Sequence, residues 1–232
     1  MREDIIERLE ALDRLSHVDI VHILKRGTAN VLFYDENVGL ALEHDCGTVF
    51  SVPFRERGLE TLYEAIGSRR LICVHSDVMY THYLASGYRS NGPCYTFSYH
   101  GEKLSEGPYP FRKMRLSEIP FILKYYDSNE QSLEYDIESG NLFCIEEDGV
   151  VMGFCGFHSE EAMGLLVILP EHRRKGLGTY MESHVINEAL SRGWTPFCNV
   201  YTTNKASIAL QQKLALVAGK VLSYWVWTPK SE

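Results

Sequence analysis

Apolar positions in the first hundred residues follow two spacings, one typical of helices and one typical of strands. Between residues 5 and 15 they recur every three or four positions with charged residues between them, which predicts an amphipathic helix. A second short helix is expected over residues 18–24. Short β-branched and aromatic runs between turn residues predict strands. The strands expected in this half lie at residues 30–34, 38–42, 48–52, 71–74 and 94–99, and further helices at 56–66 and 76–84.

A polar segment then interrupts the pattern. Residues 101–110 read Gly-Glu-Lys-Leu-Ser-Glu-Gly-Pro-Tyr-Pro, with Gly and Pro at both ends, which is typical of a linker. We therefore expect two lobes, residues 1–104 and 111–232. The strands expected in the second lobe lie at residues 111–115, 141–145, 150–158, 162–169, 197–201 and 221–227. One helix is expected to begin after Ser117 as its N-cap, and two more are expected at residues 176–190 and 207–214. The order β-α-β-β-β-α-β-α-β predicts a mixed α/β fold.

Composition and charge exclude several classes of partner. Hydrophobic residues make up 45% and charged residues 23%, as in ordinary globular proteins, and the net charge is −8. An acidic chain is a poor match for nucleic acid or an anionic membrane. The start of the chain carries acids without an apolar core, so we expect no secretion signal and a cytoplasmic protein. The six cysteines are scattered without CxxC spacing, so neither a disulfide framework nor a metal site is expected.

The segment with the clearest chemistry joins a buried strand to a helix. The strand ends at Pro170, and a basic turn leads to a helix that begins near Gly178. Unpaired N–H groups at a helix start attract anions, and glycines let a phosphate approach the backbone closely. Residues 171–175 carry a local charge of +2, which favours a phosphorylated ligand. Taken alone the turn is more typical of a plain basic surface turn before a helix, and neither GxGxxG nor GxxxxGK[ST] fits it.

The wider arrangement resembles the GNAT superfamily of N-acyltransferases. Arg173-Arg-Lys-Gly-Leu-Gly178 matches that family's Arg/Gln-x-x-Gly-x-Gly/Ala loop, and Ile168-x-Pro170 precedes it. Asn204-Lys-Ala-Ser207 follows the next strand, as it does in the family. The resemblance covers about residues 111–228 and implies a GNAT-like fold with acetyl-CoA as the acyl donor.

The resemblance also implies which residues hold acetyl-CoA. Loop amides would bind the pyrophosphate, and the pantetheine arm would lie between strands 162–169 and 197–201. Backbone N–H groups near Val167 would polarise the thioester carbonyl. The residues so assigned are Val167, Ile168, Leu169, Arg173, Arg174, Lys175, Gly176, Leu177, Gly178, Thr179, Asn204 and Ser207.

The sequence identifies neither the proton donor nor the base with a family motif. The family's tyrosine, seven residues after Asn204, is Gln211 here. Tyr201 is the substitute candidate for protonating the departing thiolate, although a strand-end aromatic also fits the rim of a core. An amine nucleophile must lose a proton before it attacks. Glu161, near His158, is the candidate base, and a merely polar hairpin turn is the alternative interpretation.

The first lobe contains echoes of the second. Residues 53–62 parallel residues 170–180, but Glu60 stands where the second lobe has Gly178. A carboxylate there would repel a pyrophosphate, so we expect a degenerate GNAT-like lobe that does not bind CoA. This lobe would complete a sheet, line the acceptor site or form a homodimer contact. A two-lobed layout also resembles the glycine N-acyltransferase-like branch.

The function expected from the sequence is therefore acyl-CoA-dependent N-acyltransfer. Acetyl would pass by direct attack to the primary amine of a small molecule or amino-acid-like acceptor. Two alternatives stay open, namely a non-catalytic acyl-CoA-binding or regulatory module and a binding protein for another phosphorylated ligand.

Overall fold

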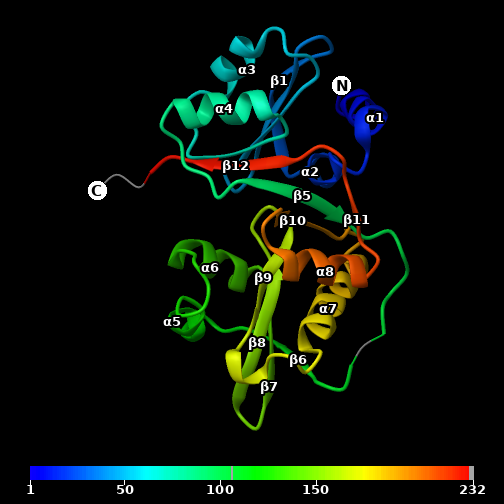
Figure 1. Cartoon of the computed structure of the whole chain (residues 1–232), viewed down its shortest axis with the longest axis vertical. Coiled ribbons are helices and arrows are strands. Elements are labelled where there is room, and N and C mark those ends of the chain that lie inside the picture. Colours follow the sequence, from blue (N-terminus) through cyan, green and yellow to red (C-terminus); the bar gives the residue numbers. More distant parts are fainter. Residues whose placement is uncertain (106, 230–232) are drawn as a thin grey trace. The chain divides into compact units, whose positions relative to one another are not determined.

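The computed structural model describes residues 1–105 and 107–229, and these fall into two compact units. The first unit contains Met1–Ser98, Asn199–Ala209 and the chain from Val217 onward. The second contains Tyr99–Cys198 and Leu210–Leu216. The division therefore differs from the linear boundary expected at residues 104–111, because later segments return to the first unit (Figure 1). No described helix has the length and apolar character needed to cross a membrane.

One sheet organises the first unit. Its strands run in the order β1-β2-β3-β4-β12-β5-β10, and β11 pairs with β5. Strands β3 and β4 are parallel, whereas β12 is antiparallel to both β4 and β5. The N-terminal elements of the unit are α1 (Arg2–Asp13), α2 (Val18–Arg26), β1 (Ala29–Asp35), β2 (Gly39–His44), β3 (Val49–Pro53), α3 (Leu59–Ile66), β4 (Leu71–Val74), α4 (Asp77–Ala85) and β5 (Pro93–Ser98). The later strands of the sheet are β10 (Phe197–Tyr201), β11 (Val217–Ala218) and β12 (Ser223–Trp227).

Alternation along these strands builds two apolar layers, one on each face of the sheet. In β2, Leu40 and Leu42 pack with α1 and α2, whereas Ala41 packs with α3 and α4. In β4, Cys73 faces the first layer, and its neighbours Ile72 and Val74 face the second. Successive side chains of a strand point to opposite faces, so a sheet covered on both sides needs apolar residues at every position.

The second unit contains a four-stranded antiparallel sheet of order β6-β7-β8-β9. Its elements are β6 (Phe111–Lys113), a 3₁₀ turn (Leu116–Glu118), α5 (Ile119–Ile122), α6 (Glu130–Glu138), β7 (Leu142–Glu147), β8 (Val150–Phe157), β9 (Met163–Ile168), a second 3₁₀ turn (Pro170–His172) and α7 (Leu177–Ser191). The residues of α8 (Lys205–Lys213) are shared between the two units.

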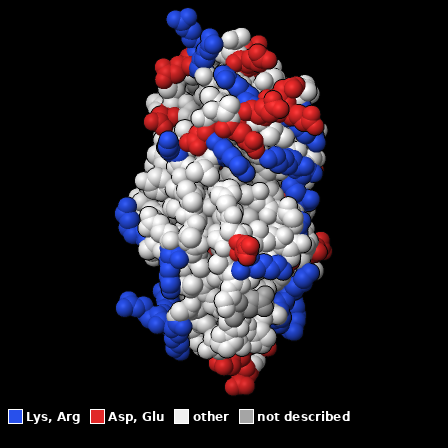
Figure 2. Space-filling model, turned by 90° about the vertical axis from the view of Figure 1, so that its right-hand side faces the viewer, with Lys and Arg blue, Asp and Glu red and all other residues white. Residues whose placement is uncertain are grey.

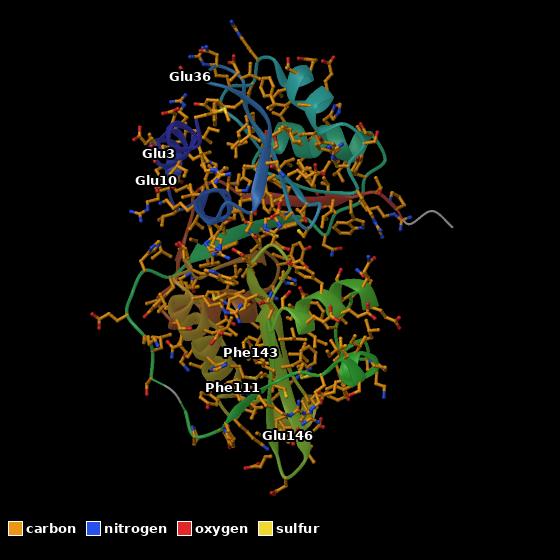
Figure 3. The ribbon with its side chains drawn as sticks, turned by 180° about the vertical axis from the view of Figure 1, so that it is seen from behind. Glu3, Glu10, Glu36, Phe111, Phe143 and Glu146 are labelled. Carbon is orange, nitrogen blue, oxygen red and sulfur yellow. The ribbon has the colours of Figure 1, made fainter. Side chains whose placement is uncertain are left out.

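Helices cover both faces of this sheet as well. Leu142 and Cys144 of β7 pack in one cluster with α5 and α6. Phe143 lies between them and contacts His184 of α7, with ring centroids 5.1 Å apart. Phe111 of β6 stacks on the same imidazole at 3.7 Å (Figure 3). The sheet therefore holds α7 by its aromatic side chains, and α7 carries the segment that the sequence singles out.

Most of the expected elements are present, and the mixed α/β prediction is confirmed. Helix α6 and the short β11 were not expected. The predicted N-cap at Ser117 is wrong, because Ser117 lies inside the 3₁₀ turn and Arg115 is its N-cap. Glu118 Oε2 accepts the backbone N–H of Arg115 at 2.8 Å, and this bond closes the turn.

Candidate functional site

The basic turn between β9 and α7 is exposed and short. After β9 a single 3₁₀ turn redirects the chain toward α7. Arg173, Arg174 and Lys175 are exposed, and Arg173 Nε donates to the carbonyl of Ile168 at 3.0 Å. On the face of the molecule in Figure 2, acidic and basic side chains are interspersed and form no continuous basic surface. The turn itself carries three consecutive exposed cations, which concentrate positive charge locally.

The first turn of α7 leaves its backbone donors uncapped. Gly176 is the N-cap with φ 80°, and no side chain caps the helix. The first bond that closes a full turn joins the N–H of Tyr180 to the carbonyl of Gly176, at 3.3 Å. The amides of Leu177, Gly178 and Thr179 precede it and have no partner within the helix. A 15-residue helix with a free N-terminus suits an anion.

Gly178 is not required by packing within the protein. A Cβ at this position would meet nothing closer than Leu210 Cδ2, at 3.9 Å, which is ordinary contact. The contrast with Gly156 is instructive, since a Cβ there would lie 2.1 Å from the carbonyl oxygen of Asn141. The sheet therefore demands Gly156, whereas Gly178 leaves room beside the helix start that a ligand can use.

Lys213 adds a cation that sequence reasoning missed. Its Nζ lies 3.1 Å from Thr179 Oγ1, so α8 brings a positive charge to the first turn of α7. The two residues are 34 positions apart, and no motif links them. Only knowledge that α8 packs beside α7 could have revealed this contact.

Strand β9 is irregular near Val167, where the family resemblance implies that backbone N–H groups polarise the thioester carbonyl. Phe154 pairs with Val167 and Gly156 pairs with Gly164, so Leu165 and Leu166 together face Cys155. Leu165 has φ 51°, which is rare for a branched side chain. Such a bulge redirects N–H groups out of the regular ladder. Within its described sheet β9 pairs with β8 alone, which leaves its other edge available to an extended ligand.

The hairpin between β8 and β9 gathers ionisable groups. Glu161, the candidate base, lies in this turn with φ 69°, and its N–H donates to the carbonyl of His158 at 2.8 Å. Ser159 Oγ donates to Asp136 Oδ1 at 3.0 Å. Burial raises the pKa of Asp136 to about 6, although His158 and Ser159 oppose the shift. The hairpin is therefore part of a buried polar cluster.

His158 is a second candidate base in this cluster. Burial lowers its pKa, which the charge of Asp136 partly offsets, so the imidazole is neutral and can accept a proton at pH 7. A Cβ at Gly164 would lie 2.3 Å from His158 Nε2. Glycine therefore lets the imidazole lie directly against β9, one residue before the bulge at Leu165.

Gln211, which stands at the family's tyrosine position, points into the second unit. It is 2% exposed, and its Nε2 donates to Glu182 Oε1 of α7 at 3.0 Å. Burial raises the pKa of Glu182 to about 7, against the effect of this hydrogen bond. The pair links α7 to α8 and offers no proton donor at the surface.

The remaining predicted residues are divided between the units. Val167 and Ile168 lie in β9, and the buried Leu169 donates its N–H to the carbonyl of Met152 at 3.0 Å. Tyr201 and Asn204 belong to the first unit, as does Ser207. Asn204 Oδ1 accepts the N–H of Ser207 at 3.1 Å, which caps α8.

The Tyr201 hydroxyl is in the protonated form that an acid role requires. It accepts a hydrogen bond from Asn91 Nδ2 at 3.5 Å. Burial raises the pKa of Tyr201, so the hydroxyl keeps its proton at neutral pH. The protonated hydroxyl of Tyr201 is therefore chemically able to donate a proton.

Comparisons with known proteins agree with this geometry. A family model described as acetyltransferase (GNAT) family matches residues 110–215. No curated protein matches the chain by sequence.

Three solved structures share the fold over nearly the whole chain. A Drosophila protein has a TM-score of 0.70 at 13% identity, covering 99% of this chain and 96% of its own. A GNAT-family acetyltransferase from Novosphingobium aromaticivorans reaches 0.58 at 16% identity, with 95% and 99% covered. A GCN5-related N-acetyltransferase from Kribbella flavida reaches 0.60 at 12%, with 94% and 96% covered. The family match, the loop at α7 and these shared folds lead to one conclusion, that residues 110–215 match the GNAT acetyltransferase family and that the chain shares the fold of these solved structures.

Proposed function

We propose that the protein is an acyl-CoA-dependent N-acetyltransferase that transfers acetyl from acetyl-CoA to a primary amine. The observation that carries the proposal is the uncapped start of α7, where Gly176 and Gly178 expose backbone donors among cationic side chains. A pyrophosphate matches both the donors and the charge.

Binding would use the loop and the open edge of β9. The amides from Arg174 to Thr179 would hold the pyrophosphate, with Arg173, Lys175 and Lys213 supplying charge. The pantetheine arm has amide groups that can pair with an edge strand. The C-terminal end of β9, at Ile168 and Leu169, lies next to the loop. Asn204 and Ser207 are proposed to contact the same arm from the start of α8.

The proposed reaction is a direct attack. His158 or Glu161 takes a proton from the acceptor's ammonium group, and the freed amine forms a bond to the thioester carbon. Backbone N–H groups near Leu165 and Val167 stabilise the oxyanion of the tetrahedral intermediate. The intermediate then loses the carbon–sulfur bond, and the thiolate leaves as the free thiol after protonation, with Tyr201 as the proposed donor. The products are an amide and CoA.

The binding step is tested with a pair of variants at one position. Gly178→Ala adds one methyl group, which the protein's packing accepts, whereas Gly178→Glu places a carboxylate where the pyrophosphate would lie. We expect calorimetry to give a CoA affinity within a few-fold of wild type for Gly178→Ala and no measurable affinity for Gly178→Glu. Equal affinities for the two variants would contradict the proposed site.

Turnover is tested separately, by incubating the protein with acetyl-CoA and a panel of primary amines while following free thiol. The specific observation that favours a second function, acyl-CoA binding without catalysis, is the inward-facing Gln211 at the family's tyrosine position. That function predicts CoA affinity with no amine-dependent thiol release. A protein that binds a phosphorylated ligand other than CoA would show no CoA affinity.

A further inference from the structure

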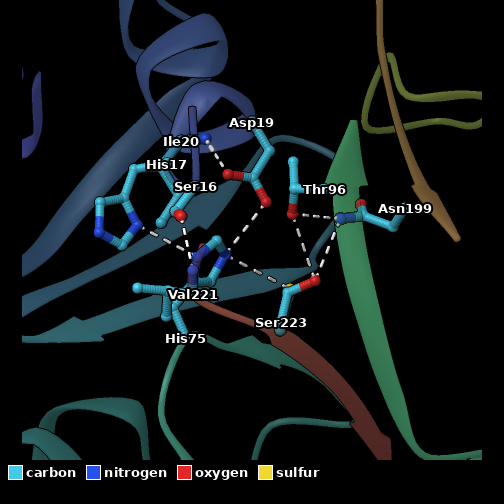
Figure 4. Close-up of polar contacts among 10 residues, drawn as sticks. Ser16, His17, Asp19, Ile20, His75, Thr96, Asn199, Val221 and Ser223 are labelled. Carbon is cyan, nitrogen blue, oxygen red and sulfur yellow. Dashed lines mark hydrogen bonds and ion pairs between the residues drawn. The ribbon is translucent and has the colours of Figure 1, made fainter. Parts of the chain in front are cut away.

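Three different metal-ligating groups meet inside the first unit, and none of them belongs to the proposed acetyl-CoA site. Asp19 projects from α2, and His75 follows β4 directly (Figure 4). Cys73 lies in β4. His75 Nε2 is 3.1 Å from Asp19 Oδ2 and 3.8 Å from Cys73 Sγ. All three ligand atoms lie within 4.8 Å of one another, and all three residues are buried. Cys73 and His75 are two positions apart, so both side chains face the same layer as α2.

The spacing of these atoms suits a tetrahedral ion. Zinc bonds of about 2.3 Å to sulfur and about 2.1 Å to nitrogen or oxygen place tetrahedral ligands about 3.6 Å apart for S and N, and about 3.4 Å apart for N and O. The observed separations of 3.8 Å and 3.1 Å differ from these values by 0.3 Å or less. The third pair, Asp19 Oδ2 and Cys73 Sγ, lies within 4.8 Å, so side-chain rotation would bring all three atoms onto one ion.

Neighbouring residues orient the ligands in the way that metal sites require. His75 Nδ1 lies 3.2 Å from His17 Nδ1, so it can donate its proton there while Nε2 binds the ion. Asp19 Oδ1 accepts the N–H of Ile20 at 2.9 Å, which leaves Oδ2 for the ion. Metal-bound imidazoles and carboxylates usually have such outer hydrogen bonds, which fix their orientation.

Charge and ligand type both favour zinc. A carboxylate, a thiolate and a neutral imidazole balance the two positive charges of the ion, so the complex is formally neutral and fits a buried site. Thiolate and imidazole select zinc over calcium or magnesium, which prefer oxygen ligands. We propose that Asp19, Cys73 and His75 form a zinc site that ties α2 to β4.

Binding to this site has a defined chemical balance. It forms one bond each from zinc to Sγ, Nε2 and Oδ2 and releases the thiol proton, while a proton on Nε2 moves to Nδ1, the nitrogen that donates to His17. Three protein ligands leave one tetrahedral position for a water or hydroxide. The sequence alone predicts no metal, because ligands at positions 19, 73 and 75 form none of the familiar spacings.

Metal content is the direct test, and it does not depend on acetyltransferase activity. The full chain is produced in zinc-supplemented medium, freed of any affinity tag and analysed by elemental mass spectrometry. We expect about one zinc ion per folded chain. Cys73→Ser should lower the content at least about tenfold. Cys94→Ser removes another buried cysteine of the same unit, from β5, and should leave the content unchanged.

Cobalt substitution gives a second readout that reports the thiolate itself. The wild-type chain is unfolded with a chelator present and refolded with Co²⁺ alone. We expect a thiolate-to-cobalt charge-transfer band in wild type and in Cys94→Ser, and none in Cys73→Ser that circular dichroism shows to be folded. If Cys73→Ser does not fold, the zinc content and the cobalt band of the wild-type chain are the decisive measurements. A folded wild type that holds less than about a tenth of an ion and shows no band would overturn the proposal, and would leave a metal-free hydrogen bond between Asp19 and His75 in its place.

Discussion

The Glu182 carboxyl is 5% exposed, and its pKa is raised by burial to about 7, from a usual value of 4.5. The folded chain therefore keeps a proton between these two pH values that the unfolded chain releases. More protons on the folded state mean that stability falls as pH rises through this window. The hydrogen bond from Gln211 favours the ionised carboxylate and therefore opposes this shift.

Replacement of this carboxyl by an amide removes the pH dependence. For Glu182→Gln we expect stability relative to wild type to increase by roughly 3 kcal/mol between pH 5 and pH 8, at about 1.36 kcal/mol per pKa unit. Urea unfolding of both proteins across this range measures the difference. Parallel stability curves for the two proteins would show that Glu182 titrates normally.

His158 gives a second prediction at the residue scale, which rests on the proposed acetyltransferase. His158→Gln should lower kcat about a hundredfold, the usual contribution of a general base. In wild type, kcat should rise with pH through a pKa below 6.5, because burial disfavours the charged imidazole. Asp136→Asn should move this rise to lower pH, since the Asp136 carboxylate stabilises the imidazolium.

Glu161→Gln is the matched control for this experiment, because Glu161 lies in the same hairpin. If Glu161→Gln loses activity while His158→Gln keeps it, Glu161 is the base that the sequence favours. Thiol-release rates measured from pH 5 to pH 9 distinguish the two.

At the scale of elements, α7 and α8 act together on the basic loop. Lys213→Ala should weaken CoA binding several-fold, with the larger effect at low salt, because an exposed charge is screened by ions. Lys124→Ala removes an exposed cation elsewhere in the second unit and should change nothing. Calorimetry at two salt concentrations gives the comparison, and equal affinities for wild type and Lys213→Ala at low salt would remove Lys213 from the site.

Elements also show which parts of the site the sequence can predict. The apolar run at 162–169 and the Gly176–Gly178 spacing are local patterns, and they correctly predicted β9 and α7. The bulge at Leu165 has no local signal, because leucine gives no sign of a positive φ. Lys213, Asp136 and the inward-facing Gln211 acquire their positions from packing between elements distant in the chain, which no spacing rule describes.

At the scale of the whole molecule, the same order of elements occurs in both halves of the chain. Two helices, three antiparallel strands, a helix, a strand, a helix and a strand run from α1 to β5, and again from α5 to β11. Gly58 caps α3 with φ 78°, as Gly176 caps α7 with φ 80°. The two halves therefore share an order of elements, and the GNAT-like character of the first lobe and its loss of CoA binding stay predictions.

Strand β12 was expected as a closing strand, but its partners could not be predicted. It pairs with β4 and β5, and Val226 is fully buried in the first unit's core. Val226→Ala should destabilise the first unit by roughly 2 kcal/mol through lost burial and a cavity. Val221→Ala, at a position 37% exposed, should have little effect. Hydrogen exchange at the amides of β4 reports the change, and equal protection in both variants would contradict this prediction.

The position of β12 has a consequence for how the chain is made. Strands β4 and β5 leave the ribosome more than a hundred residues before the strand that lies between them. The edges of β4 and β5 that later pair with β12 therefore stay unpaired until residues 223–227 have been made. Unpaired strand edges can form non-native pairs with other strands. A nascent chain that stalls before Ser223 should need chaperones, and synthesis of residues 223–227 should allow the gap to close.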